Sequence, residues 1–313
     1  MVDNGPESQS ILRTAARWGI YPLSWIVALL MLSQAAAGVI EPRQAWLMTI
    51  AGLIVFYMVM ERLIPYQRRW SMTWRSFLAD LKYVVVGGAT MSVVSTGLGL
   101  FAITISGQLS GPATDWPFWL QIPAIFLIFE GIQYTLHRAM HEANGKFGRF
   151  LWMSHVAHHL PDRVYIVMHA ASHPINQFLL QAFVRIIPIW FMGYDPFVVA
   201  VFLTINGMHG IISHFNVDVR IGFLNYIFIG PELHRYHHSA NRDEAKNYGN
   251  TLSVYDVLLG TFIYRPGVAP KELGVSTEEG LPPYRSYIEV FKLPFVTPKP
   301  ATSVDAQPQS SAG

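Results

Sequence analysis

Long hydrophobic runs alternate with short polar segments along the first half of the chain. Each run is close to the roughly 20 residues that an α-helix needs to cross the hydrocarbon core of a bilayer. The pattern therefore predicts four membrane-spanning helices in this half. Their expected ranges are residues 20–40, 46–64, 83–106 and 116–136.

Two shorter hydrophobic runs follow, at residues 174–192 and 197–214. The Gly-Tyr-Asp-Pro segment between them is typical of a tight turn. Histidines adjoin both outer ends of this pair, so we expect a helical hairpin that enters and leaves from one side of the membrane. Its arms are short, and the sequence leaves open whether they cross the bilayer fully.

Positive charge predicts the orientation of these helices, because cytoplasmic loops are enriched in Lys and Arg. Residues 61–75, from the end of the second run onward, carry four arginines, whereas residues 106–117 contain no Lys or Arg. Only Arg43, in the first outer loop, opposes this orientation. The segment after the fourth run then also lies on the cytoplasmic side. The four arginines are Arg62, Arg68, Arg69 and Arg75.

Composition agrees with a multi-pass membrane protein, since 51% of the residues are hydrophobic and only 13% are charged. A water-soluble globule of this size carries about twice that share of charge. A net charge of +2, without long basic and aromatic stripes, argues against nucleic acid as a partner. The absence of cysteine excludes disulfides, cysteine-bound metals and thiol catalysis. We expect an N-terminal membrane region, a central catalytic region and a C-terminal extension that is partly disordered from residue 297 onward. The expected boundaries are 1–115, 116–265 and 266–313.

All twelve histidines of the chain lie between residues 137 and 238, and eight of them form three clusters. Residues spaced by three or four positions share one face of a helix. Each cluster therefore places its imidazoles on one helical face, and three such faces can converge on a small volume. The clusters are His137 and His141; His155, His158 and His159; and His234, His237 and His238.

Neutral imidazole is a good ligand for iron, zinc and copper. Eight imidazoles exceed what one ion needs, which indicates a site for two metal ions rather than eight separately buried histidines. His209 and His214 lie five positions apart, about 140° around a regular helix. Both could bind the same centre only if a π-bulge or a helix end lies between them.

Several other residues near the clusters have competing interpretations. His169 is expected to be a packing residue, and His173, just before Pro174, could either face the substrate or pack. Glu130 lies two turns before His137 on the same face and could orient a ligand imidazole. Asp256 could hold a histidine or cap a turn.

The chain resembles the fatty acid hydroxylase / sterol desaturase superfamily of integral membrane oxygenases. The resemblance covers about residues 120–265 and consists of an ordered series of motifs. The matching segments are YTLHRAMH at 134–141, LWMSHVAHH at 151–159, HP at 173–174, HFN at 214–216, PELHRYHHS at 231–239, NYGN at 247–250 and YDVLLGT at 255–261.

This resemblance implies an all-α membrane protein with about four spans, a hairpin and a cytoplasmic, histidine-rich helical cap. It further implies a non-haem centre of two iron ions that uses O₂ to oxidise an unactivated C–H bond of a lipid; zinc could replace iron in isolated protein. Asn216, in the His-Phe-Asn motif, would lie close to the centre. The chain departs from the family pattern at Leu160–Arg163, where a serine is common, and at His169. The implied ligands are the eight clustered histidines together with His214 and, less regularly, His209.

Three functions fit this sequence. Lipid hydroxylation is preferred; desaturation or stepwise oxidation at the same centre is the first alternative, and a metal-handling membrane transporter is the second. Each turnover of an oxygenase needs two external electrons, and the chain has no motif for haem, flavin or dinucleotide. A separate electron carrier and reductase are therefore expected, docking on the arginines at 62–75 and on residues 235–246. The lack of a fused electron-transfer domain favours a bacterial inner membrane.

Overall fold

The computed structural model describes residues 11–105, 111–276 and 279–296. Within these ranges the protein is built from helices and loops, with two isolated β-bridges and no β-strand. The predicted all-α fold class is confirmed. The expected disorder from residue 297 onward lies outside the described residues.

The first three helices are α1 (Ile11–Ala36), α2 (Pro42–Leu63) and α3 (Trp74–Ile105). Both α1 and α3 begin nine residues earlier than the hydrophobic runs predicted. In α1 the polar first turns are held by Arg17, whose Nε donates to Asp218 Oδ2 at 2.8 Å. Hydrophobicity alone does not predict these polar first turns, whose partner is about 200 positions away in sequence.

The next helix, α4 (Phe118–Glu142), continues beyond the predicted span and carries the first histidine cluster on its last turns. The predicted hairpin also forms. Its first arm consists of α6 (Pro174–Leu179), a π-helical segment (Leu180–Ile186) and α7 (Ile187–Met192). Its second arm is α8 (Pro196–Ser213).

Within the described residues, five helices are long and apolar enough to cross a membrane, namely α1, α2, α3 and the two arms of the hairpin. The fourth predicted span forms as α4 but is not among the five. Its Gln121, Glu130 and Gln133 side chains lower its hydropathy and are all buried inside the protein. The two hairpin arms differ sharply, since 72% of α8 but only 17% of the first arm is buried.

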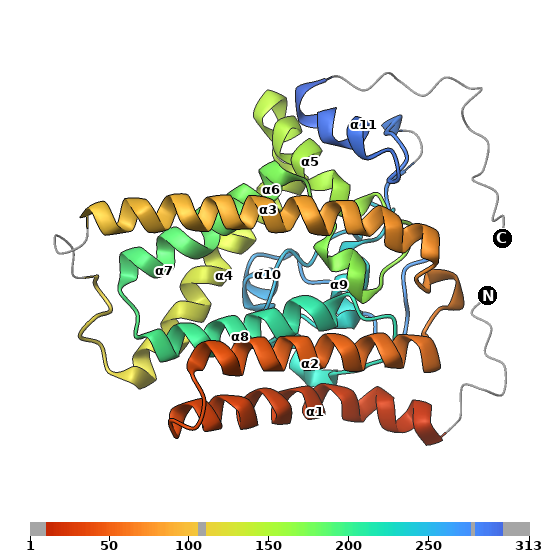
Figure 1. The fold of residues 1–313 in the computed structure, drawn as a ribbon. Helices are drawn as coiled ribbons and strands as arrows, with labels where there is room; N and C mark the ends of the chain where they lie inside the picture. Colours follow the sequence, from red (N-terminus) through yellow and green to blue (C-terminus); the bar gives the residue numbers. More distant parts are fainter. Residues whose placement is uncertain (1–10, 106–110, 277–278, 297–313) are drawn as a thin grey trace.

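Helices α1, α2 and α8 lie side by side, and α3 runs along the opposite side of the molecule (Figure 1). The start of α1, the α2–α3 loop and the end of α8 lie at the same end (Figure 1). This agrees with the alternation of spans inferred from the charge pattern.

The short helices α9 (Pro231–His237) and α10 (Val254–Leu258) lie between these layers, and α5 (Gly145–His159) lies on the other side of α3, near α6 (Figure 1). The C-terminal helix α11 (Tyr287–Lys292) belongs to a hydrophobic cluster in which Val290 packs with Val156 of α5. The histidine clusters of α4, α5 and α9 are thereby held together inside the helical frame.

Candidate metal centre

Nine histidines lie in two adjoining groups that could each hold a metal ion. In each group, one ring nitrogen per histidine lies within 4.8 Å of those of all its partners. The first group joins α4, α5 and α9, and the second joins α5, the end of α8 and α9. The first group is His137, His141, His155, His159 and His237; the second group is His158, His214, His234 and His238.

The Nε2 atoms of both groups converge. In the first group His155 Nε2 lies 3.0 Å from Nε2 of both His137 and His159. In the second group His234 Nε2 lies 3.0 Å from His214 Nε2 and 3.1 Å from His238 Nε2. All eight histidines predicted from helical spacing therefore come together, with His214 as the ninth.

Backbone carbonyls fix the orientation of four of these rings. His137 Nδ1 donates to Tyr248 O at 2.8 Å, and His237 Nδ1 donates to Lys246 O at 3.1 Å. In the second group His158 Nδ1 donates to Ala171 O and His214 Nδ1 donates to Gly210 O, both at 3.0 Å. A proton on Nδ1 leaves the Nε2 lone pair free, and this is how second-shell acceptors commonly orient metal-binding imidazoles.

Burial keeps these rings in the neutral form that binds metals. It lowers the pKa of His158 from 6.5 to about 4, although the Ala171 carbonyl partly opposes the change. The pKa values of His155, His159, His234 and His238 are lowered further, first by burial and then by the neighbouring histidines.

The donor set fits metal ions. Converging Nε2 lone pairs repel one another unless a cation lies between them, and some ring nitrogens have no other partner. Buried ring nitrogens without a hydrogen-bond partner include His141 Nε2 and His237 Nε2 of the first group, and His234 Nδ1 and His238 Nδ1 of the second. Imidazole-only ligation suits iron, zinc and copper rather than magnesium or calcium.

Glu130 supports the site one step further out than expected, because its carboxylate accepts hydrogen bonds from the backbone amides of residues 250–252 and from no histidine. Asp256 acts similarly and, of its two predicted roles, takes that of capping a turn. Its carboxylate accepts from the amides of Tyr248 and Gly249. Burial raises the pKa of Asp256 to about 6. Both acids shape the loop whose Tyr248 carbonyl orients His137.

Three further predicted residues, His209, His173 and Asn216, also lie outside both groups. His209 points away from the centre: its Nδ1 donates to Ile229 O at 2.9 Å, and its ring stacks on Phe228. The helix does end before His214, as simultaneous binding required, but His209 lies earlier on the regular part of α8. The structure thus gives no support to His209 as a ligand.

His173 and Asn216 tie segments together rather than facing the centre. The His173 side chain caps the start of α6, and its Nε2 donates to Phe291 O at 2.9 Å. The Asn216 side chain accepts from Gln67 N and donates to Gln67 O, which fixes the α2–α3 loop beside His214.

His169 lies closer to the centre than its predicted packing role implied, with its Nδ1 3.2 Å from His214 Nδ1. Sequence reasoning also missed Trp152, whose ring centroid lies 5.2 Å from that of His141 and 5.7 Å from that of His159. Position was the available signal for Trp152, since it lies three residues before His155 on the same helical face.

The segment after residue 265 also contacts the centre. Gly274 N donates to His238 O at 3.0 Å, and Trp152 Nε1 donates to Glu279 Oε2 at 3.3 Å. The described part of the C-terminal extension therefore packs beside both histidine groups.

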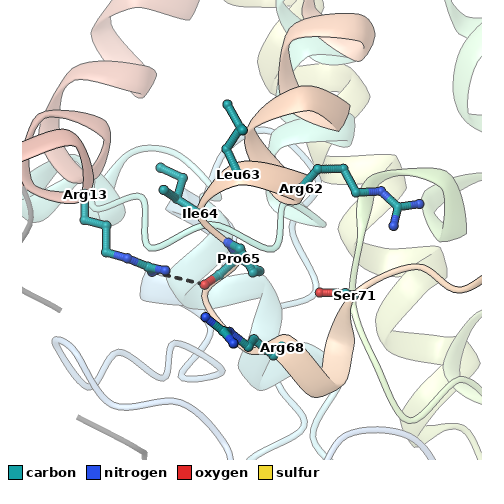
Figure 2. A pocket seen from close by; sticks show the side chains of 7 residues that line it. All are labelled: Arg13, Arg62, Leu63, Ile64, Pro65, Arg68 and Ser71. Carbon is teal, nitrogen blue, oxygen red and sulfur yellow. Dashed lines mark hydrogen bonds between the residues drawn. The ribbon is translucent and has the colours of Figure 1, made fainter. Parts of the chain in front are cut away.

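Two of the arginines expected to dock a partner, Arg62 and Arg68, line a surface cavity of about 560 Å³ together with Arg13 (Figure 2). The Arg13 guanidinium donates to Pro65 O at 3.2 Å at the rim of this cavity (Figure 2). Arg235, in contrast, is buried and donates to the carbonyls of Phe215 and Val217, so it is not part of a docking surface.

Comparison with known proteins gives a consistent result. A sequence profile of the fatty acid hydroxylase family matches residues 122–261. An ornithine lipid hydroxylase from Rhizobium tropici is 29% identical over 243 residues, which cover 74% of this chain and 70% of that protein. Alkylglycerol monooxygenase from Xenopus tropicalis is 28% identical over 153 residues, covering 48% of this chain and 31% of that protein. The human alkylglycerol monooxygenase is 29% identical over 136 residues, covering 41% and 27%. No solved structure shows a significant match.

Residues 122–261 therefore match the fatty acid hydroxylase family, and the resemblance to the fatty acid hydroxylase / sterol desaturase superfamily is confirmed. The protein is a membrane protein with a histidine-rich site suited to metal ions, and its relatives are lipid hydroxylases and monooxygenases.

Proposed function

We propose that this protein is a membrane-bound, non-haem di-iron oxygenase that hydroxylates a C–H bond of a lipid. The observation that carries the proposal is the pair of adjoining histidine groups inside the segment that matches the fatty acid hydroxylase family. Five histidines of the first group and four of the second would hold one iron ion each. Bound there, the ions would supply the activation of O₂ and the oxidation of the C–H bond.

The chain's own residues supply geometry and exclude water. Carbonyls of Tyr248, Lys246, Ala171 and Gly210 keep the ring protons on Nδ1, so the Nε2 atoms face inward. The histidines of both groups are buried or nearly so, which keeps bulk water from the reacting atoms. Trp152 covers the first group from the side of α5.

The overall reaction requires one lipid C–H bond, O₂, two electrons and two protons, and it yields one hydroxyl group and water. We propose that the electrons come from a separate carrier and reductase. The cavity lined by Arg13, Arg62 and Arg68 lies beside the ends of α1 and α2 and offers positive charge for such a partner (Figure 2). On this proposal the centre lies on the cytoplasmic side of a bacterial inner membrane.

Hydroxylation is favoured over desaturation because the curated relatives are named as a hydroxylase and as monooxygenases. Zinc in isolated protein would be a substitute for iron. A transporter would instead be expected to place ionisable groups at helix breaks within the membrane. Both histidine groups lie where short helices meet the ends of longer ones.

Oxygen-isotope labelling tests this function directly. Membranes that contain the full-length protein, supplied with ¹⁸O₂ and an electron source, should yield a lipid that carries one ¹⁸O atom. The reaction should stop under nitrogen and with His158→Ala. A lipid that loses two hydrogens without gaining oxygen would identify a desaturase, and the absence of any O₂-dependent lipid change would refute the proposal.

A further inference from the structure

Arg185 is the only charged residue in the first hairpin arm, residues 174–192. It lies near the middle of a helix that is apolar enough to cross a membrane, on the π-helical segment Leu180–Ile186. A charge at such depth is costly, and it usually marks a functional position. Single π-helical turns are likewise frequent at functional sites.

Among the described residues, the hydrogen-bond partners of this guanidinium are neutral. Its Nη1 donates to Gln181 Oε1 at 3.1 Å, and its Nη2 donates to Asn206 Oδ1 at 3.2 Å. The third nitrogen, Nε, is buried and has no hydrogen-bond partner. In the same described part of the chain, no carboxylate lies within ion-pair distance of Arg185. A half-buried cation without a counter-charge on an apolar helix is unfavourable, so this arrangement needs an explanation beyond packing.

Arg185 connects the first hairpin arm to α8 through its hydrogen bond with Asn206. Asn206 in turn contacts the loop that supports the first group, since its Nδ2 donates to Thr251 Oγ1 at 2.8 Å. One turn further along α8, Gly210 packs against the ring of His169, whose Nδ1 lies 3.2 Å from that of His214. Arg185 therefore contacts α8 within one turn of residues that adjoin the second group.

We infer that Arg185 binds a negatively charged group of the lipid substrate, either a carboxylate or a phosphate, and so holds that end of the lipid beside the metal centre. This inference rests on the proposed function, because it assigns a substrate class to the same site. A guanidinium presents paired donors that match the oxygens of either anion. The ligand would supply both the missing counter-charge and a partner for Nε.

A purely structural role would be different, with Arg185 only bridging the first arm to α8 through Asn206. In that case its loss would lower stability and metal content without changing which lipids bind. Lipid selectivity is therefore the informative readout, and metal content and melting temperature serve as structural readouts.

The test uses iron-loaded, full-length protein in non-ionic detergent at pH 8.5. Three probes share one brominated acyl chain: a free fatty acid, a phosphatidic acid and a diacylglycerol. Quenching of tryptophan fluorescence reports binding. Wild-type protein should bind at least one anionic probe about tenfold or more tightly than the diacylglycerol. The preferred anionic probe then identifies the group as a carboxylate or a phosphate.

Arg185→Gln should remove this preference, whereas Arg185→Lys should keep part of it. Asn206→Asp provides a second variant in case Arg185→Gln does not fold. It leaves the cation in place but introduces an internal carboxylate that competes with the ligand, so it should also abolish the preference. Arg43→Gln removes the same charge from the exposed start of α2, outside any proposed site, and should leave the preference unchanged.

Equal affinity of wild-type protein for charged and neutral probes would overturn the inference, as would an unchanged preference in Arg185→Gln and Asn206→Asp. Binding requires neither O₂ nor electrons, so the two proposals fail separately. Anion selectivity through Arg185 without any lipid oxidation would refute only the proposed function, and lipid oxidation without such selectivity would refute only this inference.

Discussion

The two histidine groups differ in how the outer nitrogens of their rings are held. In the first group His137 and His237 donate to carbonyls of residues 246–248, a loop more than 100 positions away from His137 in sequence. In the second group His214 donates to Gly210, one turn back in the same helix, and His158 donates to Ala171.

The first group therefore depends on one loop, residues 246–248, for both of its carbonyls, whereas the second depends on two other backbone segments. The loop is itself held by two buried acids, Glu130 and Asp256, through the amides of residues 248–252. It follows that a change outside the histidines can weaken the first group while leaving the second intact. The predictions below test this difference.

Loss of a central imidazole should have the largest effect. His155→Ala removes the Nε2 that lies 3.0 Å from both His137 and His159, so metal content should fall and turnover should drop by more than about 100-fold. His209→Asn is the matched control, because His209 lies outside both groups and an amide can still reach Ile229 O. Metal analysis and ¹⁸O incorporation measure both variants. Full metal content in His155→Ala would refute the ligand assignment.

Asp256→Asn should have the next largest effect, and it should act on the first group alone. The substitution places an amide where two backbone N–H groups and Thr261 Oγ1 donate, so the loop that orients His137 loosens. Loss of a group that helps to orient a metal ligand typically lowers metal affinity or activity by about 10- to 100-fold. Bound iron should fall from two ions towards one. An equal loss of both ions would contradict separate support of the two groups.

Acid should destabilise the metal-free protein. The folded pKa of His158 is about 4, below its ordinary 6.5, and its clustered neighbours shift in the same direction. The unfolded chain therefore binds more protons between these values, so stability falls as the pH drops from about 7 to 4. Asp256, with its pKa raised to about 6, contributes in the opposite direction. Melting temperatures at stepped pH measure the effect, and a curve that stays flat from pH 7 to pH 5 would contradict it.

The smallest expected effect concerns the C-terminal contact with the second group. Gly274 has φ +105°, and an added Cβ would lie 3.3 Å from Pro161 O. Gly274→Ala should lower stability by about 1–3 kcal/mol and weaken metal binding at His238, to whose carbonyl Gly274 N donates. Gly260→Ala also has positive φ but no close neighbour, so it should lower stability without affecting the metal. Identical metal affinity in both variants would show that the C-terminal segment does not support metal binding.

Periodicity was sufficient to predict the three histidine faces and the hairpin, because those features depend on residues close together in sequence. His137 and His141 share a face of α4, and the turn after Met192 forms where Gly193 takes positive φ. The first turns of α1, in contrast, contact Asp218 through Arg17, and no local pattern reveals this partner.

The surroundings of the centre were harder to predict for the same reason. The apolar sequence around Glu130 is sufficient to predict a buried acid, but its hydrogen-bond partners lie about 120 positions away in sequence. His209 lies outside both groups and His169 contacts His214, because the direction of each ring depends on tertiary contacts with Ile229 and His214. No spacing pattern in the local sequence predicts the contact of Gly274 with His238.

The central claim is that two adjoining histidine groups each hold an iron ion. Anaerobic titration of the full-length protein with ferrous ion, followed by removal of loose metal and measurement of iron per chain, tests it most directly. Wild-type protein should hold two tightly bound iron ions per chain, and Asp256→Asn should hold close to one. A single ion in wild-type protein, or iron binding that survives His155→Ala and His158→Ala unchanged, would contradict it.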